Sequence, residues 1–206
     1  MPYNKNMNQV RNRLFIGRKA GTGERVKIIR WAIEHGYNTL VFPLDDKIFR
    51  GGGGKDIKLI KHFAFFIEAG GRDLSLLLPR HLFLFNKELF RMEQGKRKMN
   101  NHFCPTNPKT TAIIAKRAKK LFSRAMHKTT PDRIFHLLPD ENCENVWCQC
   151  PPCRAFRPVD QYLIAVNASA DALAKLDPQA KLSYVDFDTE PEAAKVKTRK
   201  NMIICE

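Results

Sequence analysis

Short apolar runs alternate with longer amphipathic segments along most of the chain. The apolar runs are bounded by Gly, Pro or acidic residues, which is typical of buried strands. The predicted strands span residues 13–17, 39–42, 74–78, 134–138 and 181–187, and residues 202–205 begin a sixth. Between them, apolar residues recur three or four positions apart, which indicates helices. The predicted helices span residues 25–36, 57–69, 111–126 and 161–176.

Strands that alternate with helices predict right-handed βαβ units and a parallel sheet. Acidic residues lie at the ends of the second, fourth and fifth predicted strands, at Asp45, Asp140, and Asp186 with Asp188. This clustering is typical of a (β/α) barrel, which in its complete form has eight strands in about 250 residues. We therefore predict an α/β fold: an incomplete (β/α) TIM-type barrel of five to six parallel strands, in one domain over residues 1–206. Open sheet edges would also favour an oligomer that covers them.

A glycine-rich segment at residues 50–56 resembles a phosphate-binding loop only superficially. A Walker loop requires a first glycine five positions before its Gly-Lys pair and a Ser or Thr after the Lys. Phe49 and Asp56 occupy those positions, so we expect a flexible turn and no bound nucleotide. The connection over residues 82–110 is longer than most, and loops of that length are usually functional or disordered.

The chain carries a net charge of +15, which is unevenly distributed. Residues 1–130 contain 27 Lys and Arg against 9 Asp and Glu, whereas residues 131–206 contain 9 against 12. A basic body can attract nucleic acid or an acidic sugar, but basic residues also form the solvated faces of several predicted helices. We favour the helix surfaces and expect no nucleic-acid partner.

The sequence has no run of about 18 or more apolar residues, so we expect no transmembrane helix. The N-terminal residues lack an apolar core and a small-residue cleavage site. This absence predicts that there is no signal peptide and that the protein is cytoplasmic.

The densest candidate chemistry lies in residues 133–153. The strand predicted over 134–138 ends at Pro139 and is followed by two adjacent acids, Asp140 and Glu141. Adjacent side chains of an extended segment point to opposite sides, so one of the two would reach the barrel mouth unless the turn rotates them. A glycosidase acid needs a partner carboxylate about 5–9.5 Å away, and Asp186 or Asp188 could supply it. The alternative is that both acids cap or solvate a loop.

Four cysteines follow within a dozen residues: Cys143, Cys148, Cys150 and Cys153. The last two have the two-residue spacing common in zinc sites, although the whole set is not a standard zinc ribbon. Cys104 could join it from the long connection. We expect either a structural zinc, a disulfide, or buried and free thiols. Four thiolates would close the coordination sphere of the metal, which favours a structural role over a catalytic one.

Several separate motifs occur in the order found in one bacterial family. They are Leu76-Leu77-Leu78-Pro79-Arg80, Glu88-Leu89-Phe90-Arg91-Met92, Gly95-Lys96-Arg97, Phe103-Cys104-Pro105-Thr106-Asn107-Pro108 and Trp147-Cys148-Gln149-Cys150-Pro151-Pro152-Cys153-Arg154, with Asp160-Gln161 and Asn167. On these residues the chain resembles the glycoside-hydrolase-like barrel family known as domain of unknown function 4838. The resemblance covers roughly residues 65–204.

The resemblance implies a TIM-barrel relative of α-glucuronidases and β-N-acetylhexosaminidases, and therefore carbohydrate chemistry. Asp140-Glu141 is also similar to the Asp-Glu pair that hexosaminidases carry after strand four. By that analogy Glu141 would be the general acid, and Asp140 would orient a substrate acetamido group that acts as the nucleophile. Arg72 departs from the family pattern, because the family has His there. The change replaces a proton-transfer group by a permanent cation.

Other residues are candidates for sugar binding. Trp147 offers an aromatic face to the C–H groups of a pyranose, or it packs over the cysteine loop. Arg72, Arg97 and Asn107 could hydrogen-bond a sugar carboxylate or hydroxyl, or they could order loops. His136 lies within the strand predicted over 134–138, and we expect it to be a core histidine.

Two hypotheses of function follow. The first is a glycoside-hydrolase-like domain that cleaves a glycosidic bond in an acidic or N-acetylated sugar, or that is inactive because barrel strands are missing. The alternative is a non-enzymatic basic module with a cysteine-bound metal, which binds nucleic acid or an acidic polysaccharide.

Overall fold

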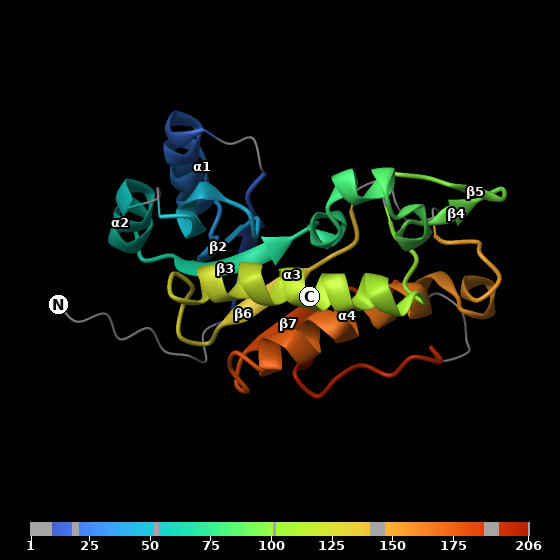
Figure 1. The fold of residues 1–206 in the computed structure, drawn as a ribbon. Helices are drawn as coiled ribbons and strands as arrows, with labels where there is room; N and C mark the ends of the chain where they lie inside the picture. Colours follow the sequence, from blue (N-terminus) through green and yellow to red (C-terminus); the bar gives the residue numbers. More distant parts are fainter. Residues whose placement is uncertain are drawn as a thin grey trace.

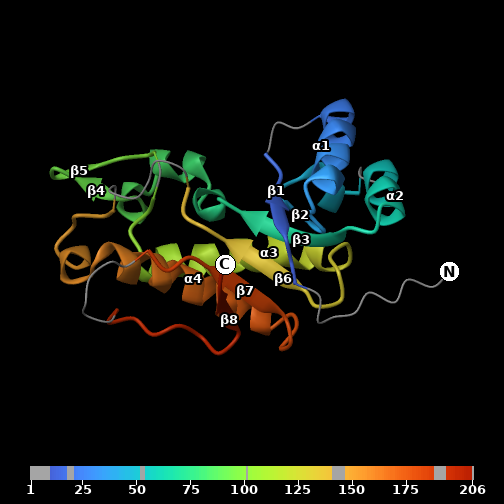
Figure 2. The same cartoon turned by 180° about the vertical axis from the view of Figure 1, so that it is seen from behind.

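The molecule is built on a parallel sheet of six strands. A computed structural model describes residues 10–17, 21–51, 54–100, 102–140, 147–187 and 194–205. In chain order the strands are β1 (Arg13–Phe15), β2 (Thr39–Phe42), β3 (Phe66–Gly71), β6 (Ile134–Leu137), β7 (Lys181–Tyr184) and β8 (Met202–Ile204). Each strand pairs in parallel with the next one along the chain (Figures 1 and 2), so the sheet has the sequential strand order of a (β/α) barrel.

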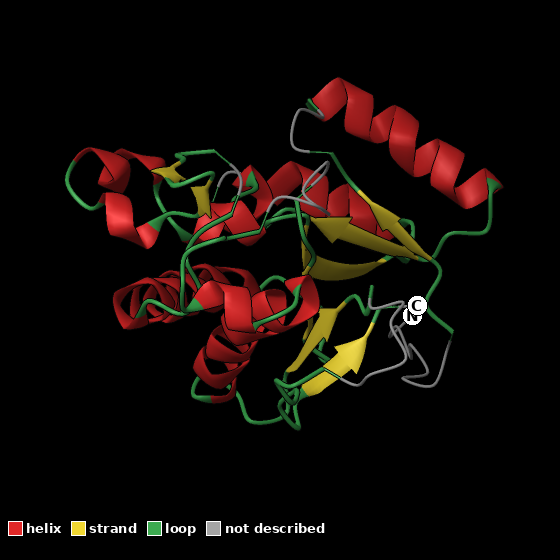
Figure 3. Cartoon of the chain, turned by 90° about the vertical axis from the view of Figure 1, so that its right-hand side faces the viewer, coloured by secondary structure: helices red, strands yellow, loops and turns green. Residues whose placement is uncertain are grey.

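Four helices lie against one face of this sheet. They are α1 (Thr22–Glu34), α2 (Gly54–His62), α3 (Pro108–Met126) and α4 (Pro158–Ala174). Figure 3 shows the strands curving, with the helices on the outer side of the curve. Strand residues in register with one another, such as Leu40 with Ile67 and Phe135 with Leu182, supply the sheet side of the core. Each buried side chain of this size stabilises the fold by about 1.5–3 kcal/mol.

The predicted fold class is confirmed: this is an α/β fold with six parallel strands that alternate with helices, and it forms an incomplete barrel. Within the described ranges β1 pairs only with β2 and β8 only with β7, so the sheet is open between them. The helix predicted over residues 111–126 is α3, with Ile114, Ala118 and Phe122 on its buried side, as the periodicity indicates. Among the described residues, no helix is both long and apolar enough to cross a bilayer.

The prediction was wrong over residues 57–78. The helix predicted to reach residue 69 ends at His62, and the third strand is β3 (Phe66–Gly71), not residues 74–78, which form a 3₁₀ helix (Leu74–Leu77). Ala64 has a φ of 68°, a left-handed conformation that stops a helix. The backbones of β3 and β6 approach most closely at Gly70. Only glycine fits there, because a Cβ atom would lie 1.9 Å from the carbonyl oxygen of His136.

The long connection over residues 82–110 is ordered where the structure describes it. It contains two 3₁₀ helices (Arg80–Leu84 and Lys87–Leu89) and a small hairpin of β4 (Met92–Glu93) and β5 (Lys96–Arg97). Further 3₁₀ turns span Lys47–Phe49 and Cys153–Ala155. In Figure 1 the hairpin lies well away from α1 and α2, on the side of the molecule where β6 ends. The connection therefore builds up the C-terminal edge of the sheet, where a barrel carries its chemistry.

Candidate functional site: a pocket at the strand ends and a cysteine centre

A pocket opens at the C-terminal ends of β6 and β7. Its free volume is about 100 Å³. The residues that line it are Arg72, Leu138, Pro139, Trp147, Val185 and Phe187. Most of its lining residues are apolar and one is an arginine, which is the composition expected of a small-molecule site. In barrel folds this end of the strands is where ligands bind.

The aromatic wall of the pocket is a stack of rings. The Trp147 ring lies parallel to that of His102, with centroids 4.1 Å apart and an interplanar angle of 8°, and it also stacks on Phe187 at 6.0 Å. Only 6% of Trp147 is exposed. The neighbouring Tyr162 donates its hydroxyl hydrogen to the carbonyl oxygen of Leu137 at 2.6 Å. These contacts make Trp147 a rigid wall whose packing also fixes the end of β6.

Asp140 ties the end of β6 to the 3₁₀ helix after β3. Its two carboxylate oxygens accept hydrogen bonds from the backbone N–H of Ser75 at 2.8 Å and from its hydroxyl at 2.7 Å. In these bonds Asp140 orders a loop, which was one of the two alternatives that the sequence left open. Each carboxylate oxygen still has a second lone pair that can accept a hydrogen bond from a ligand. Glu141 and Asp188 lie outside the described residues.

Asp186 lies next to the pocket but does not line it. Its neighbours Val185 and Phe187 both line the pocket, and Asp186 is exposed. Successive side chains of an extended segment point to opposite sides, which explains this placement. The described structure thus brings Arg72 and Trp147 together at the pocket and leaves Asp186 outside it.

Four buried cysteines form a second centre: Cys104, Cys148, Cys150 and Cys153. Their sulfur atoms all lie within 4.8 Å of one another. Cys104 Sγ is 3.6 Å from Cys150 Sγ and 3.7 Å from Cys153 Sγ. A tetrahedral zinc with Zn–S bonds of about 2.3 Å requires sulfur atoms roughly 3.8 Å apart. The described thiols are therefore spaced for a tetrahedral metal, and they form no disulfide.

Three of the four predicted cysteines, Cys148, Cys150 and Cys153, lie in this cluster together with Cys104. The fourth, Cys143, lies outside the described residues. Because Cys104 is far from the other cysteines in the sequence, their spacing indicated only that Cys104 could be a ligand of the same site. What brings it close is the bridge between Phe90 and Phe103, together with the bond from the N–H of Cys104 to the carbonyl oxygen of Leu89 at 2.8 Å.

Polar groups around the cysteine centre point at its sulfur atoms. The N–H of Met92 donates to Cys148 Sγ at 3.2 Å, and the Thr106 hydroxyl lies 3.0 Å from Cys153 Sγ. Arg97 Nη1 lies 3.8 Å from Cys148 Sγ and also donates to the carbonyl oxygen of Phe90 at 2.6 Å. Such donors stabilise thiolate charge and orient the ligands of a metal. Arg97 thus faces the cysteines and is not among the residues that line the pocket.

Gln161 at the start of α4 holds the cysteine loop in place. Its amide nitrogen donates to the carbonyl oxygens of Cys148 at 3.1 Å and Cys153 at 3.2 Å, and its amide oxygen accepts from the N–H of Cys148 at 3.0 Å. Two other residues of the family resemblance hold a different segment: Asp160 accepts from the N–H of Val196, and Asn167 donates to the carbonyl oxygen of Lys197, both at 2.8 Å.

The electrostatics of the cysteine centre favour a shared negative charge. Hydrogen bonds from Cys148 and Cys153 hold the pKa of Cys104 far below its ordinary value. The same contact with Cys104 raises the pKa of Cys148 to about 11 and raises that of Cys153 as well. The direction of these shifts favours a thiolate at Cys104, which the other two thiols stabilise by hydrogen bonds. Arg97 lies beside the cysteines as a countercharge. Burial lowers the pKa of Arg97, but the hydrogen bond and charge of Cys104 outweigh burial, so the pKa of Arg97 is raised.

Asn107 has a structural position. It is the N-cap of α3, where its side-chain oxygen accepts from the N–H of Lys109 at 3.0 Å and its nitrogen donates to the carbonyl oxygen of Glu88 at 3.3 Å. It is not among the residues that line the pocket.

Sequence reasoning missed His102, Ser75, Phe187 and Gln161. Gln161 alone had a signal, because it belongs to a motif of the resemblance.

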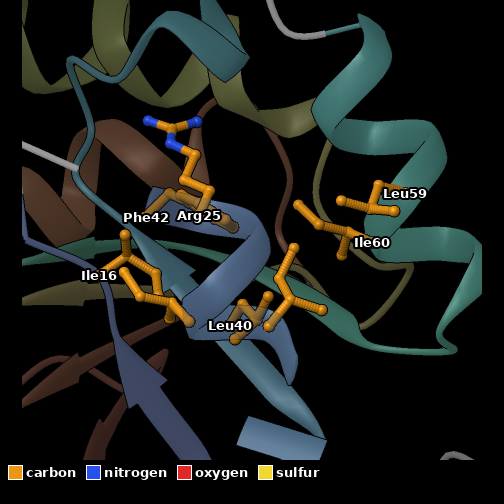
Figure 4. A pocket seen from close by; sticks show the side chains of 8 residues that line it. Ile16, Arg25, Leu40, Phe42, Leu59 and Ile60 are labelled. Atoms are coloured by element: carbon orange, nitrogen blue, oxygen red, sulfur yellow. The ribbon is translucent and has the colours of Figure 1, made fainter. Parts of the chain in front are cut away.

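A second hollow lies between α1, α2 and the sheet, and Figure 4 shows its apolar lining. Its free volume of about 10 Å³ is that of one water molecule at most. The Arg25 guanidinium points away from Leu59 and Ile60 in this view, and it donates to the Asp46 carboxylate at 2.6 Å. The hollow is a small packing gap in the core and holds no ligand-sized space.

Comparisons with known proteins support the fold. No family model matches the chain, and no curated protein matches its sequence significantly. A structure of the tandem GH20 catalytic modules of the pneumococcal exo-β-D-N-acetylglucosaminidase StrH is similar, with a TM-score of 0.61 and 16% identity, over 93% of this chain and 57% of that one. A second StrH structure, from work on N-glycan recognition and hydrolysis, has a TM-score of 0.63 and 14% identity, over 93% and 56%.

At these identities the similarity shows the fold alone. The chain spans a little over half the length of the StrH chains it matches. The fold is therefore of the (β/α)-barrel type, like that of the StrH modules, with six parallel strands in the described residues.

Proposed function

We propose that the pocket at the strand ends binds a sugar residue, and that the chain is a glycoside-hydrolase-like module for an acidic or N-acetylated sugar, related to the domain of unknown function 4838 family. The observation that carries this proposal is the position of the pocket. Its lining residues Leu138 and Pro139 lead directly into Asp140 and Glu141 in the sequence, and the stacked rings of Trp147 and Phe187 also line it. The similarity to GH20 modules supports the class of fold but not the choice of sugar.

The lining of the pocket suits part of a sugar ring. The C–H groups of a pyranose, or the methyl group of an acetamido substituent, would pack on the apolar wall that Trp147 and Phe187 form. The guanidinium of Arg72 would hydrogen-bond a uronic carboxylate or an acetamido oxygen. An acidic substrate would gain more from Arg72 than a neutral one, because a charge-assisted bond is about twice as strong as a neutral one.

In the reaction we assign to this site, Glu141 is the general acid that protonates the leaving oxygen. Asp140, held by two hydrogen bonds from Ser75, supports the adjacent turn and orients a polar group of the substrate. For an N-acetylated sugar that group is the acetamido N–H, which an acceptor such as a carboxylate can fix while the acetamido oxygen attacks the anomeric carbon.

The experiment is hydrolysis of aryl glycosides of N-acetylglucosamine and glucuronic acid. Glu141→Gln should reduce release of the aryl alcohol about 10²–10⁴-fold, which is the usual contribution of a general acid. Glu144→Gln, the same change three positions further along the sequence, should leave the rate within about twofold. Arg72→Gln should discriminate the sugars by weakening the glucuronide more than the N-acetylglucosaminide. Full activity in Glu141→Gln would contradict the assignment of the general acid.

Binding without hydrolysis must be measured separately, because a module with six barrel strands can keep a sugar site and lack turnover. Titration of glucuronic acid and of N-acetylglucosamine, followed by Trp147 fluorescence in a Trp31→Phe background, reports occupancy of the pocket. The expected result is a saturable change in Trp147 emission, and Arg72→Gln should weaken the binding of glucuronic acid more than that of N-acetylglucosamine. A protein that neither hydrolyses the aryl glycosides nor binds either sugar would contradict the proposed function.

For the cysteine centre we infer a structural zinc bound by Cys104, Cys148, Cys150 and Cys153. The residues fit this ion, since four soft sulfur ligands with tetrahedral spacing and N–H or O–H donors around them are the usual structural zinc site. Such an ion would supply no open coordination position for a substrate. It would link the loop after β3 to the loop after β6, directly next to Trp147.

A further inference from the structure

The inner face of the curved sheet carries a polar cluster that neither proposal uses. The outer face of the sheet packs on the helices, so the alternate residues of each strand point inward. The register places Gly70 beside His136, His136 beside Ser183, and Ser183 beside Ile203 on this inner face. Two positions before Gly70 lies Glu68, and two positions after Ile203 lies Cys205. The backbone N–H of Cys205 donates to the carbonyl oxygen of Tyr184 at 2.7 Å, which keeps it alongside β7.

Glu68 is the fixed point of this cluster. Its side chain is fully buried, and its Oε2 atom accepts from Arg13 Nε at 2.8 Å and lies 2.6 Å from His136 Nε2. Two partners on one carboxylate oxygen hold the imidazole in one orientation, and the Phe15 ring packs against it edge-on at 5.3 Å. Because Nε2 is occupied on the β3 side, Nδ1 of His136 is left for the other side, toward β7 and β8.

The polar atoms on that other side are buried without hydrogen bonds of standard geometry. His136 and Ser183 are each only 1% exposed, and His136 Nδ1 and Ser183 Oγ have no such partner in the described structure. A buried group in this state costs free energy unless a ligand or a reaction uses it. The half-buried thiol of Cys205 lies two positions after Ile203, on the same inner face of the sheet.

The groups of the cluster favour one another's charged forms: the Glu68 carboxylate, the His136 cation and the Cys205 thiolate. Burial opposes the cation of His136, but Cys205 and Glu68 outweigh it and raise the pKa of His136. Burial also opposes the carboxylate of Glu68, yet His136 and Arg13 lower its pKa. His136 is the main cause that lowers the pKa of Cys205, with smaller contributions from Ser183 and Arg13. Tyr162 also lies near, and burial raises its pKa so that it stays neutral.

We propose that Cys205 and His136, with Glu68 holding the imidazole, form a nucleophilic thiol site on the inner face that takes a soft carbon electrophile, an alkene conjugated to a carbonyl group. In the reaction the Cys205 sulfur forms a bond to the β-carbon of the alkene. The π electron pair moves to the α-carbon, which takes the proton from Nδ1 of His136. The products are a thioether and a neutral imidazole, and no oxidant or metal takes part. The proposal is independent of both the sugar site and the cysteine centre.

The test is alkylation of the whole protein by N-ethylmaleimide at about pH 6, in buffer and in urea. Tryptic cleavage after Lys200 releases a peptide of residues 201–206, in which Cys205 is the one cysteine, so mass spectrometry follows this thiol alone. In urea the thiol has an ordinary pKa near 8.5 and is mostly protonated at pH 6. We expect Cys205 of the folded protein to react at least about fivefold faster than in urea. An equal or slower rate would overturn the proposal.

Variants separate the roles within the cluster. His136→Gln should remove the advantage at pH 6 while leaving the rate at about pH 9 within a factor of two, because the thiol is then ionised without help. His35→Gln, an exposed control, should change neither rate. If His136→Gln does not fold by circular dichroism, Glu68→Gln serves in its place. A folded variant of either kind with the unaltered rate at pH 6 would contradict the role of His136.

Discussion

The molecule contains two buried polar clusters that satisfy their atoms in different ways. At the cysteine centre, N–H and O–H donors from three neighbouring segments point at the sulfur atoms. On the inner face of the sheet, Glu68 and His136 pair closely, but Glu68 Oε1, His136 Nδ1 and Ser183 Oγ make no hydrogen bond of standard geometry in the described structure. The first cluster has the partners of a closed metal site, whereas the second keeps unused bonding capacity next to a thiol.

The two clusters show that buried cysteines can form sites of different kinds, depending on the polar groups around them. Sulfur ligands held at tetrahedral spacing suit an ion that fills the space among them. A carboxylate and an imidazole suit proton movement, because the pair holds one ring nitrogen and frees the other. In our two proposals a cysteine is therefore a structural metal ligand in one cluster and a nucleophile in the other.

We expect the largest effect from a change at the cysteine centre that prevents metal binding. Cys104→Ser should lower bound zinc from about one per chain to near zero and cost on the order of several kcal/mol of stability, because metal binding is part of the folding free energy. The thermal midpoint should fall about 2–4 °C for each kcal/mol lost. Elemental analysis and thermal unfolding measure both quantities.

Cys143→Ser is the matched control for that experiment. It removes the cysteine that local spacing had placed in the set. We expect it to retain its zinc and its thermal midpoint. Zinc retained in Cys104→Ser and lost in Cys143→Ser would reverse the assignment and restore the ligand set that the spacing predicted.

The next effect concerns Arg97, which is the countercharge of the cysteine centre. Arg97→Gln removes the donor 3.8 Å from Cys148 Sγ and should weaken metal affinity about 10–100-fold, the range for groups that support metal ligands. Competition with a chelator measures this affinity, and Lys96→Gln, at the exposed position beside Arg97 in β5, is the control. A loss of sugar binding with unchanged metal affinity would instead support the sugar-binding role that the sequence suggested for Arg97.

The ion pair of the inner face should act through pH. The pKa of His136 is raised, so its stabilisation is full below its ordinary value of 6.5 and is lost as pH rises through the folded pKa. The pKa of Glu68 is lowered, so its stabilisation is full above 4.5 and is lost as pH falls through the folded pKa. The difference in thermal midpoint between the wild type and His136→Gln should therefore be greatest between about pH 4.5 and 6.5. A difference that does not vary with pH would show that the pair is not ionised in the folded protein.

The smallest effects compare one hydroxyl from each cluster. Thr106→Val removes a hydroxyl that lies 3.0 Å from Cys153 Sγ and should cost about 1 kcal/mol. Ser183→Ala removes a buried hydroxyl without a hydrogen bond of standard geometry and should cost less than about 0.5 kcal/mol, or stabilise slightly. Denaturant unfolding of both variants measures the difference. Equal costs would mean that Ser183 is bonded as well as Thr106 is.

Local periodicity predicted the elements whose pattern is complete within their own sequence. The apolar face of α3, from Ile114 to Ala125, and the short run of β6 are examples. Periodicity failed at β3 because Phe65 to Ala69 continues the apolar residues of α2, and a short apolar run does not distinguish a strand from a buried helix. It takes the packing against β6, which Gly70 permits, to make that run a strand.

The sequence by itself determined the alternation of strands and helices, the parallel sheet and the presence of acids and cysteines after β6, because these follow from residue types a few positions apart. Only the tertiary structure decided which cysteines meet, that Arg97 faces sulfur while Arg72 faces the pocket, and that Glu68 lies against His136. The physical reason is that these contacts join residues far apart in the chain. Their distances depend on how the strands and loops pack together, and no local pattern records that packing.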